Sequence, residues 1–309
     1  MAGRHPPPPH PAQPDVTATR PARRIPALIN SASGNAAAAR EALGANDSFD
    51  VREVAPDALN DALDEVVAEG AKRVLVAGGD GTIAAAAHTL LSTDVELAIL
   101  PGGTLNHFAR NLGISTVPAD ALITAVGTLC RGVDVGMVNG TVFLNTSSVG
   151  AYVRFVRVRE LLEPRFGYRI ASALAALRVL FALRLMAVEL EVDSRTLVVR
   201  TPLVFIGIGE RELQLPALGQ RTPNGRRGLH VIAVRGRSRA RLFALALSAV
   251  ARGGKSTARS PVVETFIVDR CTITRSHAAP ITIDGEIVMA DPTLEYSLRR
   301  DALRVVCPT

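Results

Sequence analysis

Three glycines and one aspartate occupy four consecutive positions of this chain, in the segment Gly78-Gly79-Asp80-Gly81-Thr82. The apolar run 74–77 precedes the segment and alanines 84–87 follow it, so we predict a strand, a tight loop and the start of a helix. Glycine lets backbone N–H groups turn toward a ligand, and a helix N-terminus adds positive charge, so the loop suits phosphate. The Asp80 carboxylate would repel phosphate unless it binds a metal, takes a proton or accepts a bond from a ligand hydroxyl.

Two more loops of small polar residues follow predicted strands. Strand 27–29 runs into Asn30-Ser31-Ala32-Ser33-Gly34 before helix 36–43, and strand 98–100 runs into Pro101-Gly102-Gly103-Thr104 before helix 105–112. Strand 49–54 and helix 58–69 lie between them. Alternating strands and helices predict a parallel sheet covered on both faces, which binds ligands beyond the carboxyl ends of its strands. All three loops fall at that edge.

From about residue 133 the pattern changes to mostly antiparallel β structure. Asn139-Gly140 predicts a tight hairpin between strands 133–138 and 141–145. A helix at 169–185 is interpreted as a core helix whose arginines reach solvent, with a helix on a membrane surface as the alternative. The other predicted elements are strands 187–192, 196–208, 229–234, 265–268, 272–274 and 281–288 and helix 240–251.

Composition limits the functional classes. The 309 residues are 48% hydrophobic and only 4% aromatic, without tryptophan, and the net charge is +6. The high hydrophobic fraction excludes a chain that is disordered throughout. The low aromatic content indicates no surface on which nucleic-acid bases could stack. Cys130, Cys271 and Cys307 are too far apart for a disulfide framework or a zinc site. We expect a disordered proline- and arginine-rich tail at 1–24, no membrane span, and a cytoplasmic protein that can lie peripherally on the inner face of the membrane.

Two acids stand close together in the predicted strand 281–288, within Asp284-Gly285-Glu286. Alternate residues of an extended strand share a face, so both carboxylates are expected to point into one cleft. Two like charges there should raise the pKa of one of them unless a cation lies between. The alternative is a hairpin turn with solvated acids.

Taken together, the three loops and Asp284-Gly285-Glu286 resemble the catalytic domain of the diacylglycerol kinase family, the lipid kinases that include sphingosine and ceramide kinases. The resemblance runs from about residue 26 to residue 300 and is strongest before 150. It implies phospholipid metabolism, with an NAD kinase-like doubly wound α/β domain at 25–131 that binds nucleotide and a mainly antiparallel β-sandwich domain at 132–295 that binds lipid. Segment 296–309 is a candidate to return to the first domain.

The resemblance also implies the reaction and its residues. ATP with Mg²⁺ would supply a γ-phosphoryl group to a hydroxyl of diacylglycerol, a sphingoid base or a related lipid. Glu286 is the best candidate for the base, with Asp284 and Asp80 close by. The implied nucleotide contacts are Asn30, Ser33, Gly34, Gly78, Gly79, Gly81, Thr82, Gly103, Thr104 and Asn106.

The chain departs from the family pattern at two places. After Thr82 and Ile83 the family usually has polar residues, where this chain has Ala84 and Ala85. Segment 207–229 lacks the Asp-Asp-Gly run that helps many bacterial members bind a structural Mg²⁺, so we predict no such magnesium site there. Two alternatives stay open. An NAD kinase would share the Gly-Gly-Asp-Gly loop, and the two departures favour a non-catalytic homologue that binds nucleotide or lipid.

Overall fold

A computed structural model describes residues 24–192, 195–213, 218–222, 224–235 and 263–309. The predicted tail, except Arg24, and helix 240–251 lie outside these residues. The elements of the first part are strands β1 (Ile25–Asn30), β2 (Phe49–Val54), β3 (Arg73–Gly78) and β4 (Glu96–Pro101) and helices α1 (Ala36–Gly44), η1 (Pro56–Ala58), α2 (Leu59–Ala68), α3 (Asp80–Leu90), α4 (His107–Asn111) and α5 (Pro118–Val126).

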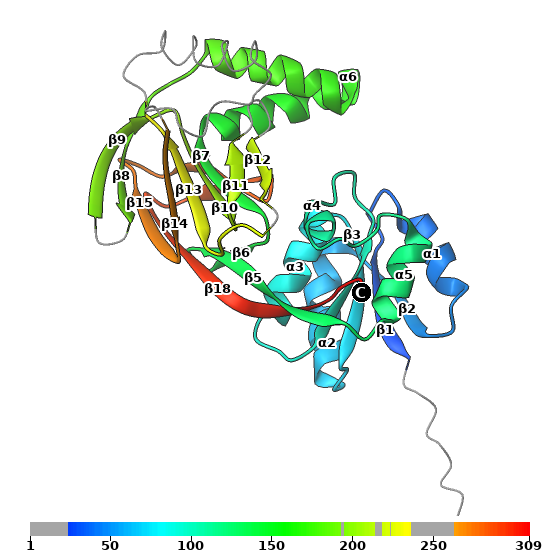
Figure 1. Cartoon of the computed structure of the whole chain (residues 1–309). Helices are drawn as coiled ribbons and strands as arrows, with labels where there is room; N and C mark the ends of the chain where they lie inside the picture. Colours follow the sequence, from blue (N-terminus) through cyan, green and yellow to red (C-terminus); the bar gives the residue numbers. More distant parts are fainter. Residues whose placement is uncertain (1–23, 193–194, 214–217, 223, 236–262) are drawn as a thin grey trace, which may run out of the picture.

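The four strands of the first part are parallel, in the order β2-β1-β3-β4. Helices α1 and α5 pack together over one face, and α2 and α3 pack together over the other (Figure 1). Strand residues such as Leu28, Leu75 and Ile99 are buried because both faces are covered. The carboxyl ends of β1, β3 and β4 therefore meet at one edge.

The described residues from Cys130 onward form two packed sheets, the small two-stranded sheet β11-β12 and one long helix. Its elements are β5 (Cys130–Val138), β6 (Thr141–Phe143), β7 (Thr146–Gly150), α6 (Ala151–Phe181), β8 (Met186–Val192), β9 (Arg195–Thr201), β10 (Leu203–Ile208), β11 (Arg211–Leu213), β12 (Leu218–Arg221), β13 (Leu229–Val234), β14 (Val263–Val268), β15 (Arg270–Thr274), β16 (Ala279–Ile283), β17 (Glu286–Ala290) and β18 (Thr293–Val306).

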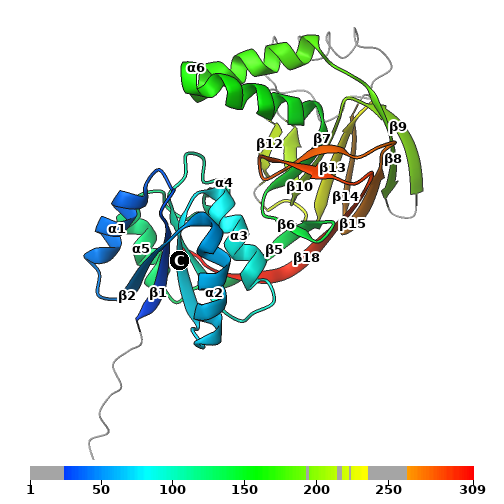
Figure 2. The same ribbon diagram turned by 180° about the vertical axis from the view of Figure 1, so that it is seen from behind.

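Strand β18 connects the two parts of the molecule. It pairs with β5 and β15 along most of its length and meets β4 at Val305 and Leu97, so one sheet runs β2-β1-β3-β4-β18-β15-β8-β9 (Figure 2). The antiparallel sheet β14-β13-β10-β7-β16-β17 packs its apolar side chains against the β15-β8 end of that sheet. The predicted fold class, a doubly wound α/β domain followed by a mainly antiparallel β-sandwich, is confirmed. The exact domain boundaries stay a prediction.

Two predicted strands are divided in the structure. Segment 196–208 breaks at Pro202, where β9 ends and β10 enters the other sheet; proline lacks the N–H that a continuous ladder needs. Segment 281–288 breaks at Asp284 and Gly285, which both have positive φ, of 48° and 94°. The hairpin predicted at Asn139-Gly140 is confirmed. Helix α5 and the first half of α6 were not predicted.

Helix α6 corrects the core-helix interpretation. Gly167, with φ of 71°, divides it into two halves that fold back on each other, so that Arg154 Nη1 donates to the carbonyl of Ala182 at 3.1 Å (Figure 1). In the second half, Ile170, Leu174 and Leu177 are 56%, 41% and 52% exposed. Ala171 and Ala175 are the buried residues of this half, and their small side chains let the two halves lie close together. Among the described residues, no helix is long and apolar enough to cross a bilayer.

Candidate functional site

A pocket of about 700 Å³ lies at the carboxyl ends of β1, β3 and β4. Its walls are the three loops that follow these strands, residues of η1, α2 and α3, and one side chain from the β16–β17 hairpin. That side chain, Glu286, is the only charged one among the lining residues. The others are Asn30, Ala32, Ser33, Gly34, Asn35, Pro56, Leu59, Gly79, Gly81, Thr82, Ala85, Gly102, Gly103 and Thr104.

Side-chain hydrogen bonds fix the three loops relative to one another. Asn30 Nδ2 donates to Thr82 Oγ1 at 2.7 Å, which joins the β1 loop to the β3 loop. Asn30 Oδ1 accepts from the backbone N–H of Ala32 at 3.0 Å. Ser33 Oγ donates to the carbonyl of Gly102 at 3.1 Å, which joins the β1 loop to the β4 loop. The pocket is therefore preformed rather than assembled by a ligand.

The glycines bring two backbones into contact. A β-carbon at Gly103 would lie 2.7 Å from the α-carbon of Gly79, a separation that real β-carbons essentially never show. Only glycine at position 103 therefore lets the β3 and β4 loops meet. Gly79 and Gly81, at the N-terminus of α3, line the pocket beside this contact. Backbone N–H groups at a helix N-terminus are suited to anions.

The Gly103→Ala variant is expected to be less stable by about 2 kcal/mol and to bind nucleotide more weakly, because the added methyl group pushes two backbones apart. Chemical denaturation and calorimetric titration with ATP measure the two effects. Gly34→Ala is the matched control, since Gly34 lines the same pocket and has open space where a β-carbon would stand. Equal stability of the two variants would contradict the prediction.

Asp80 does not line this pocket. Its two carboxylate oxygens accept hydrogen bonds from the backbone N–H groups of His107 and Phe108, both at 3.1 Å, so it caps the N-terminus of α4. Asn106 has a left-handed backbone, with φ of 50°, and bonds through its side chain to both the N–H and the carbonyl of Gly103. The acid of the glycine-rich loop thus holds the next loop in place.

Asp284 and Glu286 point in different directions, which corrects the prediction that they share one face of a strand. Asp284 and Gly285 form the two-residue turn between β16 and β17, and the turn reverses the chain between the two acids. Glu286 extends to the glycine-rich loop, where a β-carbon at Gly81 would lie 2.6 Å from its Oε1. Its carboxylate is therefore the acid that faces the pocket.

Asp284 points away from the pocket and fixes the hairpin. Its carboxylate accepts from the backbone N–H groups of Leu144 at 2.7 Å, Asn145 at 2.8 Å and Thr146 at 2.9 Å. Burial raises the pKa of Asp284 from 3.8 to about 6, the three N–H groups oppose this rise, and the charge of Asp80 adds to it. The predicted rise in pKa is present, but its main cause is burial.

The loop that holds Asp284 has two more polar supports. Asn111, from α4, donates to the side-chain oxygen of Asn145 at 3.0 Å, and Arg211 Nη2 donates to the Asn145 carbonyl at 2.8 Å. Arg211 is buried, and burial lowers its pKa to about 10. Arg211 was not predicted from the sequence, because nothing in its local pattern places it beside a loop 66 residues earlier.

The structure brings most of the predicted site residues together. Gly78, Asn106, Asp80 and Asp284 lie behind the pocket wall rather than on it. Ala85 does line the pocket, so the polar groups expected after Thr82 are missing from its wall. No cluster of three or more acids, histidines or cysteines that could hold a metal occurs in the described part of the chain. The predicted residues on the wall are Asn30, Ser33, Gly34, Gly79, Gly81, Thr82, Gly103, Thr104 and Glu286.

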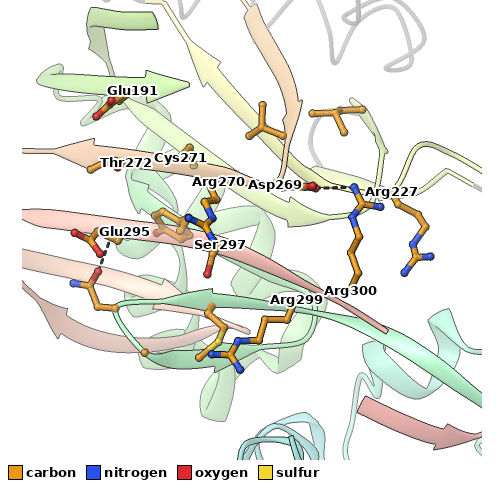
Figure 3. A pocket seen from close by; sticks show the side chains of 16 residues that line it. Glu191, Arg227, Asp269, Arg270, Cys271, Thr272, Glu295, Ser297, Arg299 and Arg300 are labelled. Atoms are coloured by element: carbon orange, nitrogen blue, oxygen red, sulfur yellow. Dashed lines mark hydrogen bonds and ion pairs between the residues drawn. The ribbon is translucent and has the colours of Figure 1, made fainter. Parts of the chain in front are cut away.

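A larger groove, of about 1000 Å³, lies on the outer face of β5, β18, β15 and β8, and none of the predicted site residues line it. Arg227 and Arg300 lie at one end of it, and Glu191 and Glu295 lie at the other (Figure 3). Arg227 forms ion pairs with Asp134, which is almost fully buried, and with Asp301. Burial opposes ionisation of Asp134, but Arg227 and the N–H of Asp301 together lower its pKa. The positive charge of Arg227 thus neutralises Asp134 on β5 and also pairs with Asp301 on β18.

The Arg227→Gln variant is expected to lose about 2 kcal/mol of stability at neutral pH, because Asp134 would be buried without its cation while Arg227 itself is partly solvated. The pKa of Asp134 is lowered in the native protein, so this contribution is present above pH 3.8 and disappears as the pH falls through the lowered pKa. Urea denaturation at pH 7 and near pH 3 measures it. Arg300→Gln, which removes a pair with the exposed Asp269, should change stability by at most about 0.5 kcal/mol. Equal losses in both variants would contradict the assignment.

Comparison with known proteins agrees with this geometry. Residues 24–138 match the family model described as "Diacylglycerol kinase catalytic domain". A "Probable lipid kinase YegS-like" of Pseudomonas aeruginosa is 42% identical over 90 residues, 28% of this chain and 30% of that protein. A "Diacylglycerol kinase" of Bacillus subtilis is 35% identical over 129 residues, 40% of this chain and 41% of that protein. These alignments span less than half the length of either relative.

The fold has a wider match. A crystal structure of a diacylglycerol kinase from Bacillus anthracis superposes with a TM-score of 0.65 and 18% sequence identity, covering 92% of this chain and 97% of that one. At that identity the likeness concerns the fold alone. The family match contains the three loops of the pocket but ends before Asp284 and Glu286. The position of Glu286 in the site therefore rests on the geometry described above.

Proposed function

Because residues 24–138 match the diacylglycerol kinase catalytic domain, we propose that this chain is an ATP-dependent lipid kinase. It transfers the γ-phosphoryl group of ATP to a hydroxyl group of diacylglycerol, a sphingoid base or a related lipid. The observation that carries the proposal is the position of Glu286. Among the described residues it is the only charged side chain on the pocket wall, which otherwise consists of glycines, hydroxyls, amides and apolar groups. A single carboxylate against a phosphate-binding loop suits proton transfer beside a phosphoryl group.

Glu286 is proposed as the general base. A lipid alcohol is a weak nucleophile, so its proton must leave as the new bond forms. The alcohol oxygen attacks the γ-phosphorus, Glu286 takes the proton, and the bond between the γ-phosphorus and the bridging oxygen breaks. ADP leaves with that electron pair, the lipid carries the phosphoryl group, and Glu286 returns the proton to solvent.

The pocket wall fits a nucleotide triphosphate. Gly79 and Gly81 lie at the N-terminus of α3, and the hydroxyls of Ser33, Thr82 and Thr104 lie around them, so backbone N–H groups and neutral donors can hold phosphate oxygens. Within the part of the chain that the structure describes, no lysine or arginine lines the pocket. We therefore propose that Mg²⁺ enters bound to ATP and offsets the phosphate charge. Pro56 and Leu59 supply an apolar wall against which the adenine ring of ATP can pack.

The reaction also suggests where the protein works. Its phosphoryl donor is found in the cytoplasm and its acceptor lies in a bilayer, so we propose a cytoplasmic protein that acts at the inner face of the membrane.

Phosphate transfer tests the proposal. The purified chain is incubated with γ-labelled ATP, Mg²⁺ and either diacylglycerol, sphingosine or NAD. Label in a lipid product supports a lipid kinase, whereas label only in NADP would show an NAD kinase. A rise in melting temperature with ATP but no labelled product in any acceptor would show a non-catalytic nucleotide-binding protein and overturn the proposal.

A further inference from the structure

The second half of α6, residues 168–181, presents large apolar side chains to solvent. Ile170, Leu174 and Leu177 are exposed and follow the i, i+4, i+7 spacing of one helical face. The residues that this half buries are Ala171 and Ala175. A helix of a protein core has the reverse arrangement, since it buries its large apolar side chains. We call Ile170, Leu174 and Leu177 the outer face of α6.

The same segment is basic. Between positions 168 and 185 the chain has Arg169, Arg178 and Arg184 and neither aspartate nor glutamate. Helical spacing puts Arg169 and Arg178 on opposite sides of the outer face. An apolar stripe bordered by arginines is typical of a helix that lies in a membrane interface, where the apolar side chains enter the acyl region and the guanidinium groups bind lipid phosphates.

Helix α6 is also close to the candidate site. It contacts β7, β16 and β17, and the β16–β17 hairpin carries Glu286. Met289, on β17, is a further exposed apolar side chain on this hairpin. In both views α6 lies at one extremity of the molecule and projects beyond the β strands (Figures 1 and 2). The helix that carries the outer face therefore also packs against the hairpin that holds the proposed base.

We propose that the outer face of α6 docks this protein on a bilayer that contains anionic phospholipids. Ile170, Leu174 and Leu177 enter the boundary between headgroups and acyl chains, while Arg169 and Arg178 bind headgroup phosphates. A second copy of the chain would bury the apolar face equally well, but facing copies would bring these arginines together. Charge therefore favours an anionic membrane. The inference names the partner surface of the proposed lipid kinase, and only its biological purpose rests on that function.

A tryptophan probe tests the docking surface, because the chain has no tryptophan of its own. Leu177→Trp is compared with Ile123→Trp, on α5, where the native side chain is 71% exposed. Each variant is mixed, without ATP, with phosphatidylcholine vesicles that contain or lack phosphatidylglycerol. The emission of Trp at 177 is expected to shift to shorter wavelength and to be quenched by brominated acyl chains, chiefly when phosphatidylglycerol is present. No shift at 177, or an equal shift at 123, would overturn the proposal.

A charge-insertion variant gives an independent readout. Leu174→Asp with Leu177→Asp is expected to lower vesicle binding at least about tenfold in sedimentation, since two carboxylates would enter the apolar boundary. Ile123→Asp should bind as the native protein does, and circular dichroism should show both variants folded. If the double variant turns a dimer into a monomer and still binds vesicles, the outer face is a subunit interface and the proposal is wrong.

Phosphate transfer separates this proposal from the proposed function. The double variant should phosphorylate a short-chain diacylglycerol dissolved in water at the native rate and a diacylglycerol embedded in vesicles more slowly. Equal loss with both substrates would show a damaged site rather than lost docking and would count against the proposal. Vesicle binding is measured without ATP, so docking on the bilayer can be detected even if the chain transfers no phosphate to any acceptor.

Discussion

The Glu286→Gln variant is expected to lose about 10²- to 10⁴-fold in kcat for phosphoryl transfer to a lipid alcohol, the usual contribution of a positioned general base. Glutamine fills the same volume and cannot accept the alcohol proton. The affinity for ATP should change little, because the glycine loops and hydroxyls that line the rest of the pocket remain. Steady-state transfer of labelled phosphate and calorimetric titration with ATP separate the two quantities.

The control for this variant is Glu191→Gln, which neutralises an acid in the outer groove, on a different face from the pocket. It should leave kcat unchanged. Gly81→Ala gives a graded test, because its methyl group would meet the Glu286 carboxylate, which is the flexible end of a side chain and can move. We expect this variant to fold and to transfer phosphate more slowly. A Glu286→Gln enzyme within tenfold of native kcat would assign the base to another group.

The α/β part of the fold was predictable because its signals are local. Buried runs such as 74–77 and 98–100 follow from unbroken β-branched and aliphatic residues, and each ends at a glycine-rich loop. Parallel strands place these loops at one edge without further information. That is why the residues of the pocket wall were predicted well from sequence, while their roles in binding nucleotide stay a prediction.

Features set by distant contacts were not predictable. The N-terminus of α4 is capped by Asp80, 27 residues earlier in the chain, rather than by a residue next to the helix. From the local pattern we predicted that the Asp80 carboxylate binds a metal or a ligand, because the pattern does not reveal that the N–H groups of His107 and Phe108 lie beside it. Arg211 and Asn145 meet for the same reason, through the pairing of β7 with β10.

Helix α6 shows the limit of hydrophobic periodicity. The spacing of Ile170, Leu174 and Leu177 is correct for an amphipathic helix, but periodicity does not say whether the apolar face meets a core or another surface. The orientation is decided by Gly167, which folds the second half back on the first, and by the alanines that allow a close approach. Sequence predicted the helix, and tertiary structure decided which face it exposes.

Asp284→Asn is expected to change how the stability of the protein depends on pH. The native carboxyl has a pKa of about 6 in the folded state against 3.8 otherwise, so the folded protein holds this proton more tightly than the unfolded chain does. The stabilisation is fully present below about pH 4 and is lost as the pH rises through 6. The pKa is higher by about 2 in the folded state, and each pKa unit corresponds to about 1.4 kcal/mol. The free energy of unfolding of the native protein should therefore fall by about 3 kcal/mol between low pH and a pH well above 6.

The asparagine variant isolates this effect because it preserves much of the geometry. Its Oδ1 can still accept from the N–H groups of Asn145 and Thr146, which bind one carboxylate oxygen in the native protein, and only the bond from Leu144 is lost. The variant should therefore be less stable than the native protein near pH 4, by about 1–3 kcal/mol for one unsatisfied donor. The difference should shrink as the pH rises, because only the native side chain titrates.

Urea denaturation of both proteins between pH 4 and 7 measures this difference, and other titrating groups cancel because they are common to both. The result decides between two opposing forces on Asp284. If the difference shrinks with rising pH, burial and the charge of Asp80 outweigh the three backbone N–H groups. If it stays constant or grows, those N–H groups hold the carboxylate ionised throughout, and the β16–β17 hairpin that presents Glu286 is fixed by a permanent charge rather than by a group that titrates near pH 6.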